Sequence, residues 1–354
     1  MDKHSFQRIK NLIDNSGLLN SEVSKQKTPI AYPYAHERIL ISGAAGSIGS
    51  GLTRLLLNSK FDTLILLDNA ETPLFYLKRE IDDTKHIKAV LGDIRDTDKM
   101  SQIFKTYKPT IVFHTAAYKH VSLVEDNAFE ALKTNIFATQ SLAQLALKHS
   151  TKRFIFISTD KAVNPIGIMG MTKLISERYL SKLNSNSSVT KFISARFGNV
   201  FGSNGSVVPL FIEQLKNGEH LTITHKDATR LFIEKNRACH LILELIKLDF
   251  EKHSKVSFNM GQPIKIKDLA EALKEILKKE GDINVSGLSK GEKLHETLIA
   301  NDEKLVATKL EDIFYIEQNT KSNTVQNLDQ LNNLNHKASY AEIKEMLEEI
   351  CDAF

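Results

Sequence analysis

The sequence predicts a doubly wound α/β fold, in which helices cover both faces of a mainly parallel sheet. Three observations carry the prediction. Short apolar segments alternate with amphipathic segments from Arg38 to Ala195. One apolar segment, Thr63–Leu67, lacks the alternation of a half-exposed strand, as expected where both faces of a sheet are covered. A glycine-rich turn joins the first apolar segment to the first amphipathic one, which is typical of this fold class.

The expected elements follow one another in a regular order. Strands are expected at Arg38–Ser42, Thr63–Leu67, His86–Leu91, Thr110–Phe113, Arg153–Ser158 and Lys191–Ala195. Helices are expected between them, at Ile48–Asn58, Pro73–Ile81, Asp98–Tyr107, Ala128–His149 and Met169–Leu183. Because a helical crossover separates each strand from the next, the strands should run parallel.

The chain divides into three parts. Residues 1–37 form an N-terminal arm, whose residues Phe6, Ile9, Leu12 and Ile13 share one helical face before a polar stretch over residues 21–28. Residues 38–196 form the doubly wound domain. Residues 197–354 form mainly a smaller lobe that closes over the carboxyl edge of the sheet, with some segments returning to the sheet. Helices in this part are expected at Pro209–Lys216, Arg237–Leu248 and Ile266–Lys278.

The composition excludes several classes of function. Among 354 residues, 42% are hydrophobic and 25% charged, as in ordinary globular proteins. The net charge of +4 is dispersed, so we expect no nucleic-acid partner. Cys239 and Cys351 form neither a disulfide framework nor a metal-ligand spacing, so we expect no metal and a reducing, cytoplasmic location. No apolar run approaches the roughly 18 residues of a membrane span, so we expect no membrane insertion.

The glycine-rich turn after the first strand predicts a dinucleotide site. Its glycines allow a pyrophosphate to approach the backbone and lie on the N-terminus of the following helix. The second strand ends in Asp68, where a ribose hydroxyl would be held. A carboxylate there repels a 2′-phosphate, and no Arg or Lys follows directly, which favours NAD over NADP. The residues expected to hold the cofactor here are Gly43, Ala45, Gly46, Ser47, Ile48, Gly49 and Asp68.

Two more strand ends should extend this site. Asp93 and Ile94 follow the third strand and suit the adenine edge of the cofactor. After the fourth strand, the small residues Ala116 and Ala117 let the backbone approach the cofactor. Lys119 and His120 follow them and either face the substrate or lie on the surface. Asn135, in the long helix, either orders backbone or water near the site or is simply solvated.

The segment Ser158–Lys173 carries a catalytic pattern from which one expected residue, a tyrosine, is missing. It resembles the extended short-chain dehydrogenase/reductases, in which a strand ends in Ser or Thr and a helix carries Tyr-x-x-x-Lys. Lys173 is present, but the position four residues before it is Met169. A thioether has no exchangeable proton. Either the enzyme is inactive, or its proton chemistry has moved to Asp160 and Lys161, and we favour the second.

Several motifs together resemble the nucleotide-sugar 4,6-dehydratases of the CapD-like polysaccharide-biosynthesis group. These motifs are Gly43–Gly49, Ser158–Pro165, Met169–Lys173, Arg196–Pro209 and Gly291–Glu296. The similarity covers about Arg38–Leu298. Members that retain configuration at C5 of the sugar carry Met at the position of Met169, whereas inverting members carry Tyr. The resemblance therefore implies a retaining enzyme. Many retaining members also carry an N-terminal membrane region, and this chain looks like a free-standing soluble form.

The resemblance implies a set of catalytic roles. A 4,6-dehydratase passes hydride from C4 to NAD, removes the C5 proton, expels the C6 hydroxyl as water and returns hydride to C6. Thr159 would bind the C4 hydroxyl, Asp160 would protonate the departing hydroxyl and Lys161 would be the base at C5. Lys173 would bind the nicotinamide ribose and supply positive charge. The group that deprotonates the C4 hydroxyl is left open between a water molecule and Lys161.

The family pattern also suggests how a UDP-sugar is held. Lys119, His120, Asn199, Ser206 and Val207 would approach the sugar and its diphosphate. Arg230 and Glu292 are placed for diphosphate and uridine contacts, and Arg suits bidentate phosphate binding. Each of these residues, taken alone, fits an ordinary surface position as well.

We expect an NAD-dependent UDP-N-acetylglucosamine 4,6-dehydratase that retains configuration at C5 and forms the 4-keto-6-deoxy sugar nucleotide for glycan or polysaccharide assembly. The N-terminal arm and exposed helices favour a homo-oligomer. An inverting dehydratase or a nucleotide-sugar epimerase is the first alternative. A catalytically silent NAD-binding regulator is the second, and the intact Thr159-Asp160-Lys161 triplet argues against it.

Overall fold

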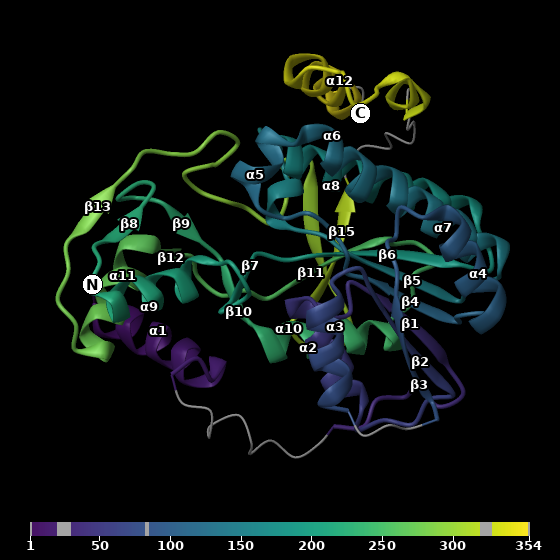
Figure 1. Ribbon diagram of the computed structural model, residues 1–354, viewed down its shortest axis with the longest axis horizontal. Coiled ribbons are helices and arrows are strands. Elements are labelled where there is room, and N and C mark those ends of the chain that lie inside the picture. The colour runs from purple at the N-terminus through teal and green to yellow at the C-terminus, as the bar shows by residue number, and fades with distance from the viewer. Residues whose placement is uncertain (1, 20–29, 82–84, 319–327, 353–354) are drawn as a thin grey trace.

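A nine-stranded sheet forms the centre of the protein (Figure 1). The structure is a computed structural model that describes residues 2–19, 30–81, 85–318 and 328–352. The strand order is β14-β15-β11-β6-β5-β4-β1-β2-β3. The strands are β1 (Arg38–Ser42), β2 (Thr63–Asp68), β3 (Ile87–Leu91), β4 (Ile111–His114), β5 (Arg153–Ile157), β6 (Lys191–Arg196), β11 (Lys255–Phe258), β14 (Glu303–Ala307) and β15 (Ile313–Gln318).

Neighbouring strands from β3 to β11 pair in parallel, while β15 pairs antiparallel with β11 and β14 antiparallel with β15. The prediction of a doubly wound α/β fold is confirmed. Each strand expected between residues 38 and 196 is present, with its ends within one residue of the predicted ones. Local apolar runs were sufficient for this prediction because parallel strands are buried on both faces.

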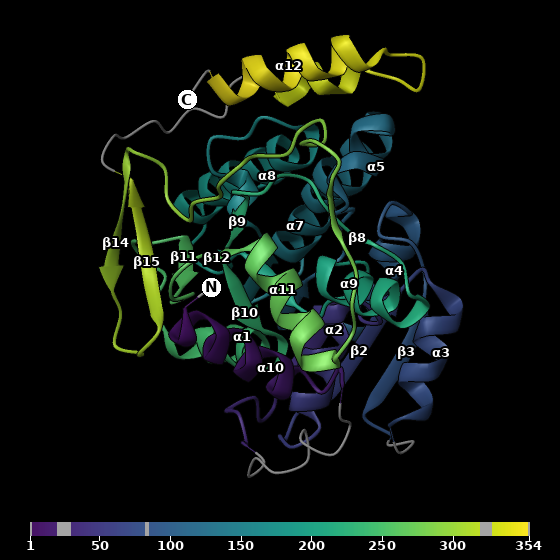
Figure 2. The same ribbon diagram turned by 90° about the vertical axis from the view of Figure 1, so that its left-hand side faces the viewer.

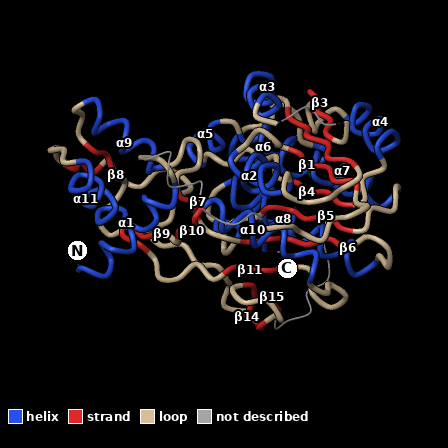
Figure 3. Tube along the Cα trace, turned by 90° about the horizontal axis from the view of Figure 1, so that it is seen from below, coloured by secondary structure: helices blue, strands red, loops and turns tan. Residues whose placement is uncertain are grey.

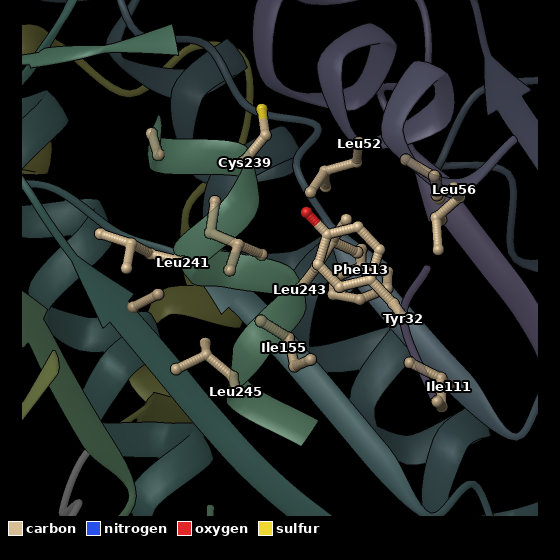
Figure 4. Close-up of a cluster of buried hydrophobic side chains, with 14 of the residues drawn as sticks. Tyr32, Leu52, Leu56, Ile111, Phe113, Ile155, Cys239, Leu241, Leu243 and Leu245 are labelled. Atoms are coloured by element: carbon tan, nitrogen blue, oxygen red, sulfur yellow. The ribbon is translucent and has the colours of Figure 1, made fainter. Parts of the chain in front are cut away.

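Helices cover both faces of the sheet. On one face lie α2 (Ser47–Leu56), α3 (Glu71–Arg79) and α10 (Lys235–Glu244), and Figure 4 shows side chains of α2, α10 and the strands gathered in one apolar cluster. On the other lie α4 (Thr97–Tyr107), α7 (Ala138–Lys148) and α8 (Ile168–Asn186). In β1, Ile39 and Ile41 pack toward the first group and Leu40 toward the second, as the period of a strand requires.

The helical stretch predicted over Ala128–His149 is present and contains a π-helical turn that was not predicted. The segment forms α6 (Ala128–Ala131), a π-helical turn (Leu132–Phe137) and then α7, and a short helix α5 (Val121–Asp126) precedes it. The π turn contains Asn135, whose Oδ1 accepts a hydrogen bond from the Tyr118 amide (2.9 Å) and whose Nδ2 donates to the Tyr118 carbonyl (3.0 Å). Asn135 thus orders the backbone after β4, and π turns often occur at functional sites.

A second lobe lies beside the carboxyl edge of the sheet (Figure 3). It contains α1 (Lys3–Ser16), β8 (Leu221–Ile223), β9 (Thr229–Arg230), β12 (Ile264–Lys265), β13 (Ile283–Val285), α9 (Val207–Asn217) and α11 (Ile266–Leu277). A separate pair of short strands, β7 (Asn199–Phe201) and β10 (Phe232–Glu234), lies where the lobe meets the rest of the protein. The predicted amphipathic helix of the arm is present, and Ile9 and Ile13 are buried in this lobe's core. The predicted polar stretch lies outside the described residues.

The last helix returns to the doubly wound part of the protein. Figure 2 shows α12 (Tyr340–Asp352) lying along the outside of α8. Ile343, Leu347 and Ile350 of α12 are buried in the same apolar cluster as Ile168 and Met171 of α8. Short 3₁₀ turns occur at Asp160–Ala162, Leu245–Lys247 and Leu328–Asn333. Within the described ranges, no helix combines the length and apolarity needed to cross a bilayer.

Candidate active site

Two adjoining cavities lie along the carboxyl ends of the central strands. The first, about 310 Å³, is lined by the residues that follow β1, β2, β3 and β4. The second, about 510 Å³, is lined by residues that follow β4, β5 and β6 and by the first turns of α2 and α8. Gly46, Thr115, Ala117, Tyr118 and Asn204 line both cavities, so the two form one continuous site.

The glycine-rich turn is packed tightly against its neighbours. Gly43 has a φ of +70°, and a Cβ on it would lie 2.7 Å from the amide nitrogen of Ala116. A Cβ on Gly49 would lie 2.2 Å from the carbonyl oxygen of Gly43. Helix α2 begins after Gly46 with no side-chain cap, so the N–H groups of its first turn are available to a ligand.

Asp68 connects this turn to the second strand. Its Oδ2 accepts a hydrogen bond from the Ala45 amide (2.8 Å) and its Oδ1 accepts one from the Ala70 amide (2.9 Å). Asp68 lines the first cavity, together with Gly43, Ala45, Gly46, Asp93, Ile94, Ala116 and Ala117. Ser47 and Ile48 line the second cavity, whereas Gly49 lies beneath the turn and lines neither.

Arg95 also lines the first cavity, and the sequence analysis missed it. Its guanidinium pairs with Asp93 (2.6 Å) and Glu130 (2.9 Å), and hydrogen bonds from Arg95 hold the pKa of Asp93 below its usual value. The guanidinium of Arg95 is thus engaged by two carboxylates. Its position two residues after Asp93 was the only available signal.

The triplet Thr159-Asp160-Lys161 follows β5, with Asp160 and Lys161 in a 3₁₀ turn and Thr159 as its N-cap. The Thr159 hydroxyl donates to Oδ1 of Asp160 (2.9 Å), and Nζ of Lys161 donates to the same oxygen (3.0 Å) and to Oδ1 of Asn199 (3.2 Å). Thr159 and Lys161 line the second cavity. Asp160 does not line it, is fully buried, and leaves Oδ2 without a hydrogen-bond partner among the described residues.

Helix α8 brings Met169 and Lys173 to the wall of the second cavity. Both are nearly buried, with 4% and 6% of their surface exposed. Nζ of Lys173 lies 3.9 Å from the centre of the Phe156 ring, an attractive contact for the charged form. Burial lowers the pKa of Lys173 to about 7, against an opposing influence of Glu177. Lys173 can therefore exchange a proton near neutral pH.

The predicted substrate residues fall into two groups. Lys119, His120, Asn199 and Ser206 line the second cavity, and burial lowers the pKa of both Lys119 and His120. Val207, Arg230 and Glu292 line neither cavity. Arg230 is instead engaged by Glu292, with 2.7 Å between Nη2 and Oε1, and donates to the carbonyl of Leu294 (3.0 Å).

A loop that was not predicted in detail crosses the site. Its Asn204 lines both cavities, its amide donates to the Ser47 hydroxyl (3.0 Å), and its carbonyl accepts from Nζ of Lys119 (2.8 Å). The Gly/Asn/Ser-rich composition of residues 197–206 was the signal for a loop there. In the part of the chain that the structure describes, no cluster of His, Cys, Asp and Glu could hold a metal ion.

Comparisons with known proteins show the family of this chain. The family model described as polysaccharide biosynthesis protein matches residues 39–318. The capsular polysaccharide biosynthesis protein CapD of Staphylococcus aureus is 39% identical over 77% of this chain, a match that spans 47% of CapD. A UDP-N-acetylglucosamine 4,6-dehydratase (inverting) of Campylobacter jejuni is 33% identical over 80% of this chain and 84% of its own length.

Two further similarities concern an epimerase and a solved structure. A UDP-glucose 4-epimerase of Rickettsia rickettsii is 31% identical over 80% of this chain and 83% of its own length. The X-ray structure of Pen from Bacillus thuringiensis superposes with a TM-score of 0.74 at 35% identity, covering 80% of this chain and 90% of Pen. The family model spans most of the sequence and includes both cavities, so this chain belongs to the family of polysaccharide biosynthesis proteins.

Proposed function

We propose that this protein is an NAD-dependent UDP-N-acetylglucosamine 4,6-dehydratase that retains configuration at C5. One observation carries the proposal: Asp160 and Lys161 form an acid–base couple beside the cavity that also receives Met169 and Lys173. A 4-epimerase needs proton transfer at C4 alone. A dehydratase also needs a base at C5 and an acid for the C6 hydroxyl, and the couple supplies both.

The first cavity and the free N-terminus of α2 fit NAD. Residues of the glycine-rich turn would hold the pyrophosphate, Asp68 the adenosine ribose, and Lys173 the nicotinamide ribose. The pairing of Arg95 with Asp93 and Glu130 leaves this cation engaged by carboxylates, which agrees with NAD rather than NADP. When bound, NAD accepts hydride from C4 and returns it to C6.

Side chains of the protein then carry out the proton transfers. The Thr159 hydroxyl passes the C4 hydroxyl proton to Asp160, to which it is already hydrogen-bonded. Lys161 takes the C5 proton, and Asp160 returns its proton through Thr159 to the C6 hydroxyl, which leaves as water. Lys161, whose N–H protons exchange with solvent, then delivers a proton to the face of C5 from which the first was taken. Because Met169 has no proton to offer, delivery to the opposite face has no donor at that position, and configuration is retained.

Incubation of the protein with UDP-N-acetylglucosamine in D₂O tests this proposal. We expect a 4-keto-6-deoxy product with deuterium at C5, and NMR coupling constants that show the original C5 configuration. The opposite C5 configuration would establish the inverting alternative, and a C4 epimer would establish the epimerase. Bound NAD with no turnover of any sugar nucleotide would favour the silent regulator.

Replacement of Met169 tests its passive role. We expect Met169→Leu, which conserves volume, to keep kcat within about threefold of the wild type, because the thioether takes no part in proton transfer. Met169→Tyr should give no gain, since a larger ring must fit a position with 4% exposure. Steady-state turnover of both variants provides the measurement. A large increase for Met169→Tyr would show that the site lacks a hydroxyl.

Gly49→Ala should weaken NAD binding. The added Cβ would lie 2.2 Å from the Gly43 carbonyl oxygen, and this backbone atom can move only by distorting the turn. We expect affinity for NAD to fall at least about tenfold, measured by calorimetry, with some loss of stability. Gly281→Ala is the matched control, because its Cβ would have no neighbour nearer than 3.5 Å. Equal affinity in both variants would contradict a role for the turn.

A further inference from the structure

The helix that carries Met169 and Lys173 to the second cavity, α8, depends on another element for its N-terminal cap. Its N-cap residue is Gly167, which offers no side chain, and its first residue, Ile168, is fully buried. Because the first N–H groups of a helix have no partner within the helix, a buried start requires an acceptor from elsewhere. Glu125 of α5 supplies it, since its Oε1 accepts a hydrogen bond from the Ile168 amide (2.7 Å).

Two glycines leave room for this carboxylate. A Cβ on Gly167 would lie 2.7 Å from Oε1 of Glu125, and a Cβ on Gly291 would lie 2.8 Å from the same oxygen. Glu125 is 3% exposed, and a buried carboxylate is costly unless donors satisfy its oxygens. The first residue of the Gly291–Glu296 motif thus contributes space for Glu125.

The second oxygen of Glu125 is satisfied by the C-terminal helix. Tyr340, the first residue of α12, donates its hydroxyl to Oε2 of Glu125 (2.7 Å). Burial and this hydrogen bond raise the pKa of Tyr340, so the hydroxyl keeps its proton and remains a donor at neutral pH. Nζ of Lys290 lies 3.1 Å from the centre of the Tyr340 ring, an attractive contact that also holds the ring.

The apolar face of α12 packs against the same part of α8, as the view in Figure 2 shows. One buried cluster contains residues of both helices, namely Ile343, Leu347 and Ile350 of α12 and Ile168, Met169 and Met171 of α8. The match to the family model ends at residue 318, so α12 lies outside the part of the chain that the model describes. Helix α12 therefore reaches the start of α8 in two ways, by apolar contact and by the hydroxyl of Tyr340.

Glu125 also connects α8 to the segment that follows β4. Helix α5 is six residues long, and its N-cap residue, His120, lines the second cavity. The carboxylate of Glu125 thus joins two parts of the cavity wall, one at His120 and one at Met169.

We propose that Tyr340 is a positioning residue, which acts through Glu125 to fix the first turn of α8 and thereby the places of Met169 and Lys173 in the second cavity. The inference rests on the proposed dehydratase function, because its consequence is a rate. Displacement of a catalytic group by about 1 Å can lower a rate by up to about 100-fold. A carboxylate that lacks one donor should allow a displacement of this kind at the start of α8.

Tyr340→Phe removes the hydroxyl and keeps the ring. Oε2 of Glu125 then lacks its donor, so the carboxylate and the start of α8 should shift. We expect kcat to fall about tenfold, while KM for UDP-N-acetylglucosamine and Kd for NAD stay within about threefold, because the glycine-rich turn and the strand ends are unchanged. A role in stability alone would lower Tm and leave kcat at the wild-type value, and that result would overturn the proposal.

Tyr315→Phe is the matched control. The Tyr315 hydroxyl donates to the carbonyl of Asp249 at the same distance, 2.7 Å, and neither residue lines either cavity. This variant loses a comparable hydrogen bond, so it should keep the wild-type kcat. Equal losses of kcat in Tyr315→Phe and Tyr340→Phe would overturn the positioning role.

Glu125→Gln separates the two hydrogen bonds from the charge. Its amide oxygen can still accept from the Ile168 amide, and its amide nitrogen can donate to the Tyr340 oxygen. We therefore expect this variant to keep more than about a third of kcat. Glu125→Leu can form neither contact and should lose at least as much as Tyr340→Phe. Equal losses in the two Glu125 variants would contradict the role of the hydrogen bonds.

Hydrogen exchange followed by mass spectrometry tests the connection without turnover. In the NAD-bound protein, the peptide that covers the first turn of α8 should exchange about tenfold faster in Tyr340→Phe than in the wild type, with exchange in β1 unchanged. Unchanged exchange in α8, or equal acceleration in α8 and β1, would overturn the proposal. The expected exchange in a protein that dehydrates no sugar nucleotide would overturn the proposed function and still support the connection between α12 and α8.

Discussion

Lys161→Met should abolish dehydration while leaving NAD binding intact. The methionine keeps most of the apolar stem but removes the only amine that both lines the second cavity and contacts Asp160 among the described residues. We expect kcat to fall by about 10³-fold, the size typical of losing a general base. If Lys161 acts only at C5, oxidation at C4 still proceeds, and reduced cofactor should accumulate in a single turnover. Near-ultraviolet absorbance and product analysis by NMR measure the two steps separately.

Lys293→Met is the matched control for this result. It removes the ammonium of a lysine close to the turn that carries Lys161, but Lys293 lines neither cavity and its ammonium donates to the carbonyl of Val163. Its effect on kcat should be much smaller than that of Lys161→Met. Unchanged turnover in Lys161→Met would exclude the residue from the mechanism. Loss of C4 oxidation as well would identify Lys161 as the base at C4, the possibility that the sequence left open.

The sequence was informative wherever a feature depends on neighbouring residues. Apolar runs predicted the strands within one residue, and the glycines predicted the turn before α2. The orientation of the Asp160 side chain was harder to predict, because its adjacency to Lys161 suggested that both side chains face the substrate. Asp160 and Lys161 lie in a 3₁₀ turn, in which successive side chains point about 120° apart, so Lys161 lines the cavity and Asp160 is buried.

Features that depend on distant contacts could not be predicted. The π turn exists together with the contact between Asn135 and the backbone of Tyr118, seventeen residues away. Arg230 suits phosphate binding by its chemistry, yet it is paired with Glu292, sixty-two residues later in the chain. Helix α12 packs along α8, the helix that carries Met169. The amphipathic pattern of α12 indicates that one of its faces is buried, but it does not indicate which element covers that face. Sequence patterns predict which face of an element is buried, but not what it packs against.

Arg196→Met should cause a large loss of stability. Arg196 ends β6, is 1% exposed, and donates to Glu177 of α8 (2.5 Å) and to Glu303 of β14 (2.6 Å). Removing the guanidinium leaves Glu177 buried without its cation, whereas Glu303 retains the ammonium of Lys255 and the amide of Ala300. Breaking such a pair typically costs about 3–5 kcal/mol. For a chain of this size we expect Tm to fall by about 5 °C.

Arg237→Met provides the comparison, because Arg237 pairs with Asp312 at 2.9 Å but is 45% exposed. Surface pairs contribute about 0–1 kcal/mol, so its Tm should barely change. Equal shifts in the two variants would mean that burial does not determine the contribution of Arg196. A partial recovery in the double variant Arg196→Met, Glu177→Gln would identify the unpaired carboxylate as the cause.

The acid dependence of stability gives an independent readout of the same network. Burial raises the pKa of Glu303, but the charges of Arg196 and Lys255 outweigh this effect. They lower the pKa to about 2, below the ordinary value of 4.5. A depressed pKa in the folded state stabilises the protein above the unfolded pKa, and this stabilisation is lost as the pH falls from about 4.5 toward 2. Arg196→Met should therefore lose less stability than the wild type over this range, measured as Tm against pH. Because Glu303 ties β14 to the end of β6 through Arg196, its protonation should loosen the contact between these two strands in acid.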